Sequence, residues 1–256
     1  MPKWARILAT IGVAVVLVGV YLSAFGVQTG CALMARYKFR SIPEAAKTPV
    51  ALPDASVSVA PHKKVSYFGY EFELPWDDVD EQNVKAFGTV HVTYFHSGNI
   101  VWFSTFPPKN FVNEISKSTQ TDPVLMRQMY GDNAFQSDYA FTSRMLQITP
   151  SKISPFSSRK EAVSGMMLLI LKTIAMPNAD SGLFSIHTGD FKGFQYCSPQ
   201  SQSTRIVDDL FADDGGVEFW FGLNKKGAVP DISQAQINRV LQSVRKVSIS
   251  APAASR

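Results

Sequence analysis

The sequence predicts an α+β protein with an N-terminal transmembrane helix, a flexible linker, and one domain in which a mostly antiparallel β-sheet packs against several α-helices. Three observations lead to this prediction: an uncharged apolar stretch near the N-terminus, a segment rich in proline and alanine, and strand-like segments that cluster in hairpins. The expected parts are an anchor with a basic flank (residues 1–40), a linker (41–64), an α+β globular domain (65–249) and a disordered tail (250–256).

The first part is an apolar stretch that begins at Ile7, ends at Val27 and contains no charged residue (residues 7–27). As a helix it would reach about 30 Å, which matches the hydrocarbon thickness of a bilayer. It is longer than the apolar region of a typical signal peptide, which favours a retained signal-anchor in contact with the lipid bilayer. Two alternatives stay open: simple cleavage near Gly26, and lipidation of Cys31 after cleavage.

The orientation of this helix follows from two opposing signals. Lys3 and Arg6 precede the apolar stretch, whereas four basic residues follow it, so a literal positive-inside rule places the domain in the cytoplasm. A short basic N-terminus followed at once by an apolar run is, however, typical of export signals. We therefore expect a single-pass membrane protein whose domain is extracytoplasmic, that is, periplasmic or at the cell surface.

Residues 41–64 differ in composition from the segments on either side. They contain four prolines, five alanines and no aromatic residue. A segment of this kind cannot bury a core, so we expect an extended spacer. The short segment 250–256 is likewise predicted to be a frayed tail.

The net charge of +4 is unevenly distributed along the chain. Residues 1–40 carry five basic and no acidic residues, whereas residues 65–249 carry 16 basic and 19 acidic residues. The basic excess therefore lies beside the predicted membrane helix, where anionic headgroups would meet it. A basic stripe on the folded domain is not indicated, and nucleic acid is excluded as a leading partner.

Strands are predicted from alternating or β-rich segments bounded by turn residues. Residues 70–74 alternate strictly between apolar and acidic side chains, and residues 87–106 predict a hairpin around Ser97, Gly98 and Asn99. Two further hairpins are expected, from residues 183–187 with 191–197 and from residues 205–211 with 217–221.

Helices are expected between and after these hairpins. Shorter helices are predicted at 111–117, 123–130 and 134–147, and a capping box of Ser158 and Glu161 starts a longer one that ends near Met176. Its uncharged middle predicts a buried central helix, or one that faces a partner or lipid. Residues 231–247 have apolar positions at helical spacing and predict an amphipathic helix.

No established catalytic motif is present, and no cofactor is expected. The four histidines do not have the spacing of a metal site, because His91 and His96 would point to opposite faces of a strand. The acidic clusters at 77–81 and 208–214 match no calcium loop and are interpreted as solvated loop carboxylates.

The leading functional hypothesis is a non-catalytic protein that binds a partner or ligand in the cell envelope. A pocket between sheet and helices would take a protein segment or a small apolar ligand. Its expected lining residues are Trp102, Phe103, Met166 and Met167.

Two alternatives belong to other functional classes. The first is a membrane-tethered, hydrolase-like enzyme with Cys197 as nucleophile and His187 as base, although Cys197 lies in a pattern typical of a buried thiol. The second is an accessory subunit of a membrane complex, which would need an exposed apolar face for its neighbour.

Overall fold

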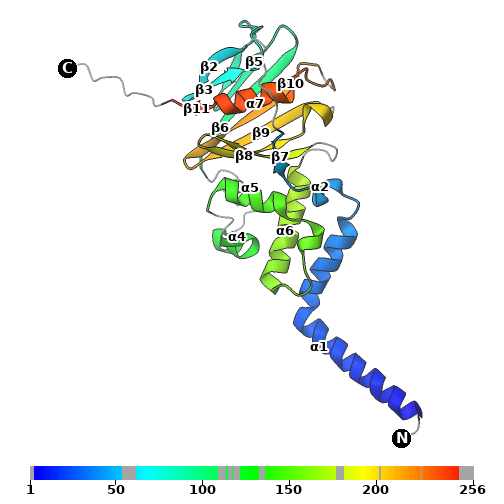
Figure 1. Ribbon diagram of the computed structural model, residues 1–256. Helices are drawn as coiled ribbons and strands as arrows, with labels where there is room; N and C mark the ends of the chain where they lie inside the picture. The colour runs from blue at the N-terminus through cyan, green and yellow to red at the C-terminus, as the bar shows by residue number, and fades with distance from the viewer. Residues whose placement is uncertain are drawn as a thin grey trace, which may run out of the picture. The chain divides into compact units, whose positions relative to one another are not determined.

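The computed structural model describes residues 3–53, 62–108, 114, 117, 122–132, 136–176, 182–201, 203–225 and 227–247 (Figure 1). It confirms the α+β class and an N-terminal apolar helix. Most of the expected helix at 111–117, part of the linker (54–61) and the tail at 250–256 lie outside the described residues.

The chain forms two compact units. The helical unit comprises residues 1–48, 115–136 and 140–179, and the strand unit comprises residues 49–114, 137–139 and 180–256. Each unit has its own core of buried apolar side chains, and each is described below by itself.

The helical unit contains α1 (Lys3–Lys38), α2 (Pro43–Ala46), α4 (Pro123–Tyr130), most of α5 (Asp138–Gln147), the short 3-10 helix η2 (Pro150–Lys152) and α6 (Arg159–Ala175). The predicted capping box is present at the start of α6, where the Ser158 hydroxyl accepts from the Glu161 N–H and the Glu161 carboxylate accepts from the Ser158 N–H. These bonds satisfy backbone groups that a helix leaves free at its N-terminus.

The helix α1 changes character along its length. From Val16 to Val27 its apolar side chains are largely exposed, whereas Ala32 and Ala35 further along are buried against Met166 and Leu169 of α6. Small alanine side chains let two helices approach closely, so this face of α1 packs as part of the unit's core. The part of α1 from residue 16 to 38 is long and apolar enough to cross a membrane.

The core of the helical unit encloses one lysine. Lys172 of α6 is fully buried, and its Nζ donates to the carbonyl oxygens of Ala45 (3.5 Å), Ile148 (2.7 Å) and Lys47. An ammonium group has three donors, and these three carbonyls match them. The lysine thereby ties the segment after α2 and the segment after α5 to α6.

The strand unit is built on an eight-stranded sheet in the order β1-β7-β8-β9-β10-β6-β5-β4, which is antiparallel except for the β1–β7 pair. The bounds are β1 Val50–Ala51, β4 Lys85–Phe87, β5 Val90–Tyr94, β6 Asn99–Phe106, β7 Leu183–Thr188, β8 Phe191–Tyr196, β9 Arg205–Ala212 and β10 Gly215–Leu223. A three-stranded sheet has the order β11-β3-β2, with β2 Lys63–Tyr67, β3 Tyr70–Leu74 and β11 Arg245–Lys246. The helix α7 (Gln234–Ser243) and the 3-10 helix η3 (Pro199–Ser201) complete the unit.

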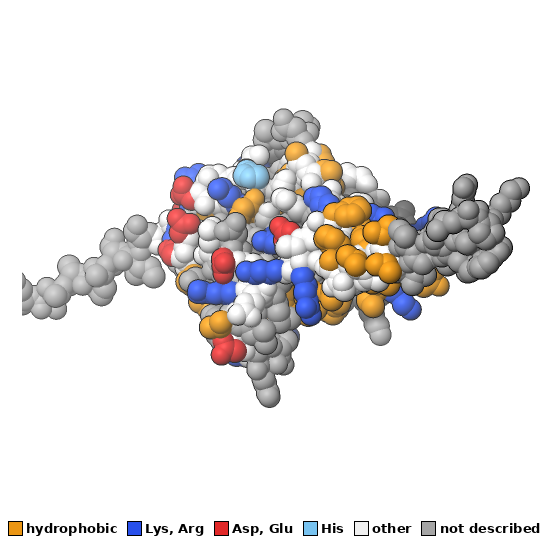
Figure 2. Space-filling view, turned by 90° about the horizontal axis from the view of Figure 1, so that it is seen from below, with side chains coloured by type: hydrophobic (Ala, Val, Ile, Leu, Met, Phe, Trp, Pro, Cys, Tyr) orange, Lys and Arg blue, Asp and Glu red, His pale blue; other side chains and the backbone are white. Residues whose placement is uncertain are grey.

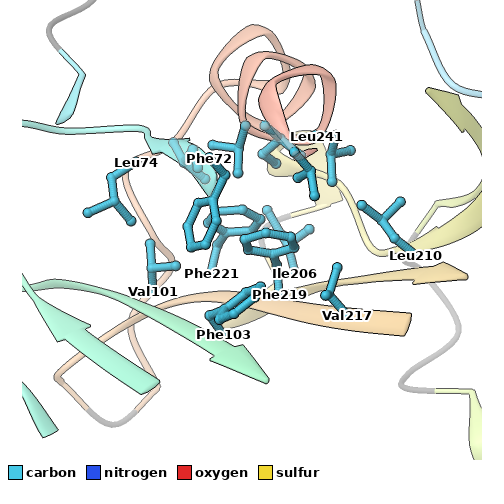
Figure 3. Close-up of a cluster of buried hydrophobic side chains, with 14 of the residues drawn as sticks. Phe72, Leu74, Val101, Phe103, Ile206, Leu210, Val217, Phe219, Phe221 and Leu241 are labelled. Carbon is cyan, nitrogen blue, oxygen red and sulfur yellow. The ribbon is translucent and has the colours of Figure 1, made fainter. Parts of the chain in front are cut away.

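The core of the strand unit lies between the large sheet, α7 and β3 (Figure 3). Side chains alternate along a strand, so Phe219 and Phe221 of β10 and Phe103 of β6 all point to this side. Phe72 of β3 completes the group, with its ring centroid 4.7 Å from that of Phe103 and 5.0 Å from that of Phe219. All four side chains are at most 1% exposed, so this packing is the main apolar contact of the unit.

Two local expectations differ from the structure. Residues 41–53 of the predicted linker contain α2 and β1, because Ala45 is buried in the helical core and β1 pairs with β7. The last predicted helix is shorter than its apolar periodicity suggests: α7 ends at Ser243, and Arg245 and Lys246 form β11 against β3. In both cases hydrogen bonds to a distant segment decide the local conformation.

We expect Lys172→Met to lower the stability of the protein and to remove the contribution of this lysine to the pH dependence of the free energy of unfolding. Burial, together with the nearby charge of Lys152, lowers the pKa of Lys172 to about 8, whereas an unfolded lysine titrates near about 10.4. Between these values the unfolded chain binds a proton that the native chain has lost, so wild-type stability rises with pH through this window. The variant lacks that rise, and its unpaired carbonyls cost about 1–3 kcal/mol.

Denaturation of the full chain in detergent, followed by circular dichroism across this pH range, measures the effect. Lys160→Met, at an exposed position of the same helix, is the matched control. Parallel pH curves for wild type and Lys172→Met would contradict the assignment.

Candidate functional site

The structure places the two residues of the enzymatic hypothesis far apart on one hairpin. His187 is exposed on β7 and pairs with Lys192, whereas Cys197 follows the other end of β8. Cys197 lies five positions beyond Lys192 along the chain, a distance of roughly 17 Å in an extended strand. Cys197 is also 1% exposed and packs in the core of the strand unit. A nucleophile and its base need hydrogen-bond contact, which this register does not provide.

The residues of the predicted pocket are also distributed over different surfaces. Trp102 and Phe103 are neighbours on β6 and therefore face opposite sides of the sheet: Phe103 lies in the core, whereas Trp102 is half-buried on the other face. Met166 is buried in the core of the helical unit, and Met167 follows it as a half-buried residue of α6.

The acidic cluster at 208–214 is not a solvated loop throughout, which corrects the interpretation from sequence. Asp213 and Asp214 are exposed in the hairpin turn, but Asp208 and Asp209 lie inside β9. Asp208 is fully buried on the core side, and neither of its carboxylate oxygens has a hydrogen-bond partner among the described residues. Burial first, and then the charge of Asp209, raises the pKa of Asp208 well above its usual range, so its neutral form is favoured.

A chain of three polar side chains occupies the opposite face of the sheet. Asp209 of β9 lies directly across from Glu218 of β10, and the two carboxyl groups share a hydrogen bond. The phenol of Tyr196, on the neighbouring strand β8, donates to Asp209. Three adjacent strands thus hold a continuous line from Tyr196 through Asp209 to Glu218.

The electrostatics of this line favour one shared proton between the two carboxyl groups. Desolvation, and then the charge of Glu218, raises the pKa of Asp209 well above its usual range. Desolvation also raises the pKa of Glu218, but the hydrogen bond from Asp209 and the charge of Arg205 oppose this effect. Asp209 is therefore the protonated partner and donates to the Glu218 carboxylate, as in other closely spaced carboxyl pairs.

Aromatic side chains continue the same face beyond Glu218. Trp220 lies two residues along β10, and its ring is stacked on that of Trp102 with centroids 5.3 Å apart. The guanidinium of Arg205 lies over the Trp220 ring, 4.4 Å from the centroid, and Phe87 meets Trp102 edge-on. We call this surface the aromatic–carboxyl face; it consists of Tyr196, Asp209, Glu218, Trp220, Trp102 and Arg205.

The aromatic–carboxyl face remains partly accessible. Trp102, Trp220, Asp209 and Glu218 are half-buried, and Arg205 is exposed. Within the strand unit, α7 packs on the other side of the sheet. The face therefore offers stacked rings, one guanidinium and a carboxyl pair to a binding partner.

A metal centre is not indicated in the part of the chain that the structure describes, where no three histidine, cysteine or acidic side chains group closely enough to hold an ion. His91, one of the histidines considered above, is buried and stacks on Tyr67 with ring centroids 3.5 Å apart. Burial lowers the pKa of His91, which favours the neutral ring in this contact.

One signal in the sequence does indicate the Asp209–Glu218 pair. In a two-residue hairpin, positions at equal distances from the turn are cross-strand partners. With Asp213 and Asp214 as the two central turn residues, this rule places Asp209 opposite Glu218. By contrast, Trp102 and Trp220 are brought together only by pairing of β6 with β10, across more than one hundred residues. No local pattern indicates that contact.

The chain matches no protein-family model, no curated protein and no solved structure. The geometry of the described residues therefore carries the functional argument.

We expect Asp209→Asn to be tolerated and to weaken the pH dependence of stability. The amide keeps a donor for Glu218 and removes the shared proton. An unfolded aspartate loses its proton near pH 3.9, at about its ordinary pKa. In the wild type, the native state still holds the shared proton at pH values above this. Stability should therefore fall as pH rises from that value through the raised native pKa. The variant should show a shallower fall, with the remainder contributed by Asp208 and Glu218.

Thermal unfolding between acidic and neutral pH tests this expectation. Asp213→Asn, an exposed aspartate in the turn of the same hairpin, provides the control and should retain the wild-type slope. An unchanged slope in Asp209→Asn would show that Asp209 does not carry the proton.

Proposed function

We propose that this protein is a single-pass, membrane-anchored protein whose domain binds a protein partner in the cell envelope without catalysis. The observation that carries the anchoring is the continuity of α1, which runs without a break from its exposed apolar part to the buried face at Ala32 and Ala35. An apolar surface of this length on one helix is costly in water and stable in a bilayer.

The same continuity favours a retained helix over a cleaved signal. Cleavage after Gly26 would leave the mature chain beginning inside α1, one residue before the buried Gln28. Cys31 lies within α1 and contacts the helical core, so lipidation there would place the new N-terminus inside this packing. For the orientation, we retain the extracytoplasmic side indicated by the short basic N-terminus.

The binding function rests on the composition and form of the aromatic–carboxyl face. Tryptophan, tyrosine and arginine are the residues most enriched in the energetic centres of protein interfaces, and this face gathers all three types. Small-molecule sites are typically concave, whereas this surface follows neighbouring strands of a sheet. A protein partner is therefore the better fit, and an integral membrane protein as partner would make this chain an accessory subunit.

The membrane anchor is tested by introducing two charged residues into the apolar part of α1. Each arginine near the centre of a membrane helix costs about 2.5–3.5 kcal/mol. We expect the variant Leu17→Arg with Val20→Arg to lose most of its membrane fraction, and the matched variant with alanine at both positions to keep it. Alkaline extraction of membranes measures the fraction, and intact-mass spectrometry of the wild type reports whether the N-terminus is retained. A shortened or lipidated wild-type chain would refute the retained anchor.

The binding face is tested by site-specific photocrosslinking in cells. Val207 is the cross-strand neighbour of Trp220 on this face, and a photoreactive residue there should yield one partner of defined mass. Because buried tryptophans dominate such interfaces, Trp220→Ala should reduce that product by about tenfold or more.

A photoreactive residue at the exposed Ser66 of β2 serves as the control and should not give the product. Equal products from both positions, or a product unaffected by Trp220→Ala, would mean that the aromatic–carboxyl face is not the binding surface.

A further inference from the structure

Three residues at the start of α6 form a small surface with no evident role in the fold of the helical unit. Phe156, in the turn before α6, is 74% exposed, and Arg159 and Lys160 in the first turn of α6 are also exposed. We call these three residues the α6 corner. A phenylalanine beside an arginine and a lysine is the composition of segments that lie at a membrane surface.

The positive charges of Arg159 and Lys160 are unfavourable at this end of the helix. The N-terminus of a helix carries a partial positive charge, so basic residues in its first turn are repelled by the helix dipole. Glu161 is committed to the capping box with Ser158, and neither Arg159 nor Lys160 forms an ion pair within the described part of the chain. Helix stability therefore does not explain these cations.

The packing of α1 against α6 shows which residues of α1 lie beside the α6 corner, that is, the height of the corner along the axis of α1. Ala32 and Ala35 share a core with Met166 and Leu169, and nearer the C-terminal end of α6 Lys172 reaches the carbonyl of Ala45 in α2, which follows α1 in the chain. The two helices therefore run side by side in the same direction (Figure 1). Both rise about 1.5 Å per residue, so moving seven residues back from Met166 and from Ala32 places Arg159 near the level of Phe25.

That level coincides with the end of the apolar stretch at Val27. Below it the side chains of α1 from Val16 onwards are largely apolar and exposed. Figure 2 shows a group of hydrophobic side chains with Lys and Arg side chains beside it. Arg159 and Lys160 would be too costly inside the hydrocarbon, so they mark the level where it ends. An exposed phenylalanine beside them would lie at the boundary between headgroups and acyl chains.

We propose that the α6 corner rests on the anionic surface of the bilayer that α1 crosses, with Phe156 in the headgroup–acyl boundary and Arg159 and Lys160 on lipid phosphates. This inference depends on the proposed anchoring and adds a second contact with the same leaflet. A basic residue close to an anionic surface is attracted to it, and an inserted aromatic ring adds apolar contact. The helical unit would then be held against the membrane at two points.

Lipid photocrosslinking of the full chain in vesicles of phosphatidylcholine and phosphatidylglycerol tests this contact. Benzoylphenylalanine is placed at position 156, where it replaces a phenylalanine, and at Leu17 as a probe of the membrane helix. Ile174 is the matched control: it is 75% exposed on the same α6, but about 22 Å further from the proposed membrane surface. We expect lipid adducts at 17 and 156, and several-fold fewer at 174.

The charges are tested in the same experiment. Arg159→Gln with Lys160→Gln should reduce the adduct at 156 several-fold, as should vesicles of phosphatidylcholine alone, whereas Arg127→Gln on α4 should not. Adducts at 17 with only background at 156 would overturn this inference and leave the anchor intact. Background at all three positions would instead refute the anchor itself. If the yield of the adduct at 156 is unchanged both in the Arg159→Gln, Lys160→Gln variant and in vesicles of phosphatidylcholine alone, the role of the phosphates is refuted.

Discussion

The alternation of side chains along β10 is the constraint on which both the core and the candidate site of the strand unit depend. Val217, Phe219 and Phe221 point to α7 and β3, so Glu218 and Trp220 must point to the other side. A shift of one residue in the pairing would place a carboxylate in the core and three apolar side chains outside. Because burial of the apolar set holds the register, it also positions Glu218 opposite Asp209 and Trp220 beside Trp102.

The helical unit satisfies a different constraint, since one helix meets two environments. Where α1 is exposed it carries large apolar side chains, and where it meets α6 it presents Ala32 and Ala35, which permit close packing. The buried ammonium of Lys172 then joins three backbone carbonyls around the same core. An anchor packed in this way would transmit the position of the membrane to the helical unit more rigidly than a flexible tether.

Buried polar groups account for some of the differences between sequence and structure. Asp208 and Asp209 resemble loop carboxylates because acidic residues surround a turn, yet the strand continues through both of them. Lys172 ends an apolar run and resembles a solvated helix residue, yet it is fully buried. For these two groups the accommodating environment comes from other segments: a neighbouring carboxyl and a phenol for Asp209, and carbonyls of α2, of the residue after α2 and of the residue after α5 for Lys172. A charged residue type by itself predicts an exposed side chain, and this prediction is wrong for these residues.

Periodicity, turn residues and local hydrogen bonds are enough to predict the α+β class, the apolar N-terminal helix, the three hairpins and the capping box at Ser158. Three features become visible only in the folded chain: part of the proline-rich segment is folded, Cys197 and His187 lie apart, and Trp102 stacks on Trp220. Those outcomes depend on pairing between distant strands and on burial, which no local pattern records.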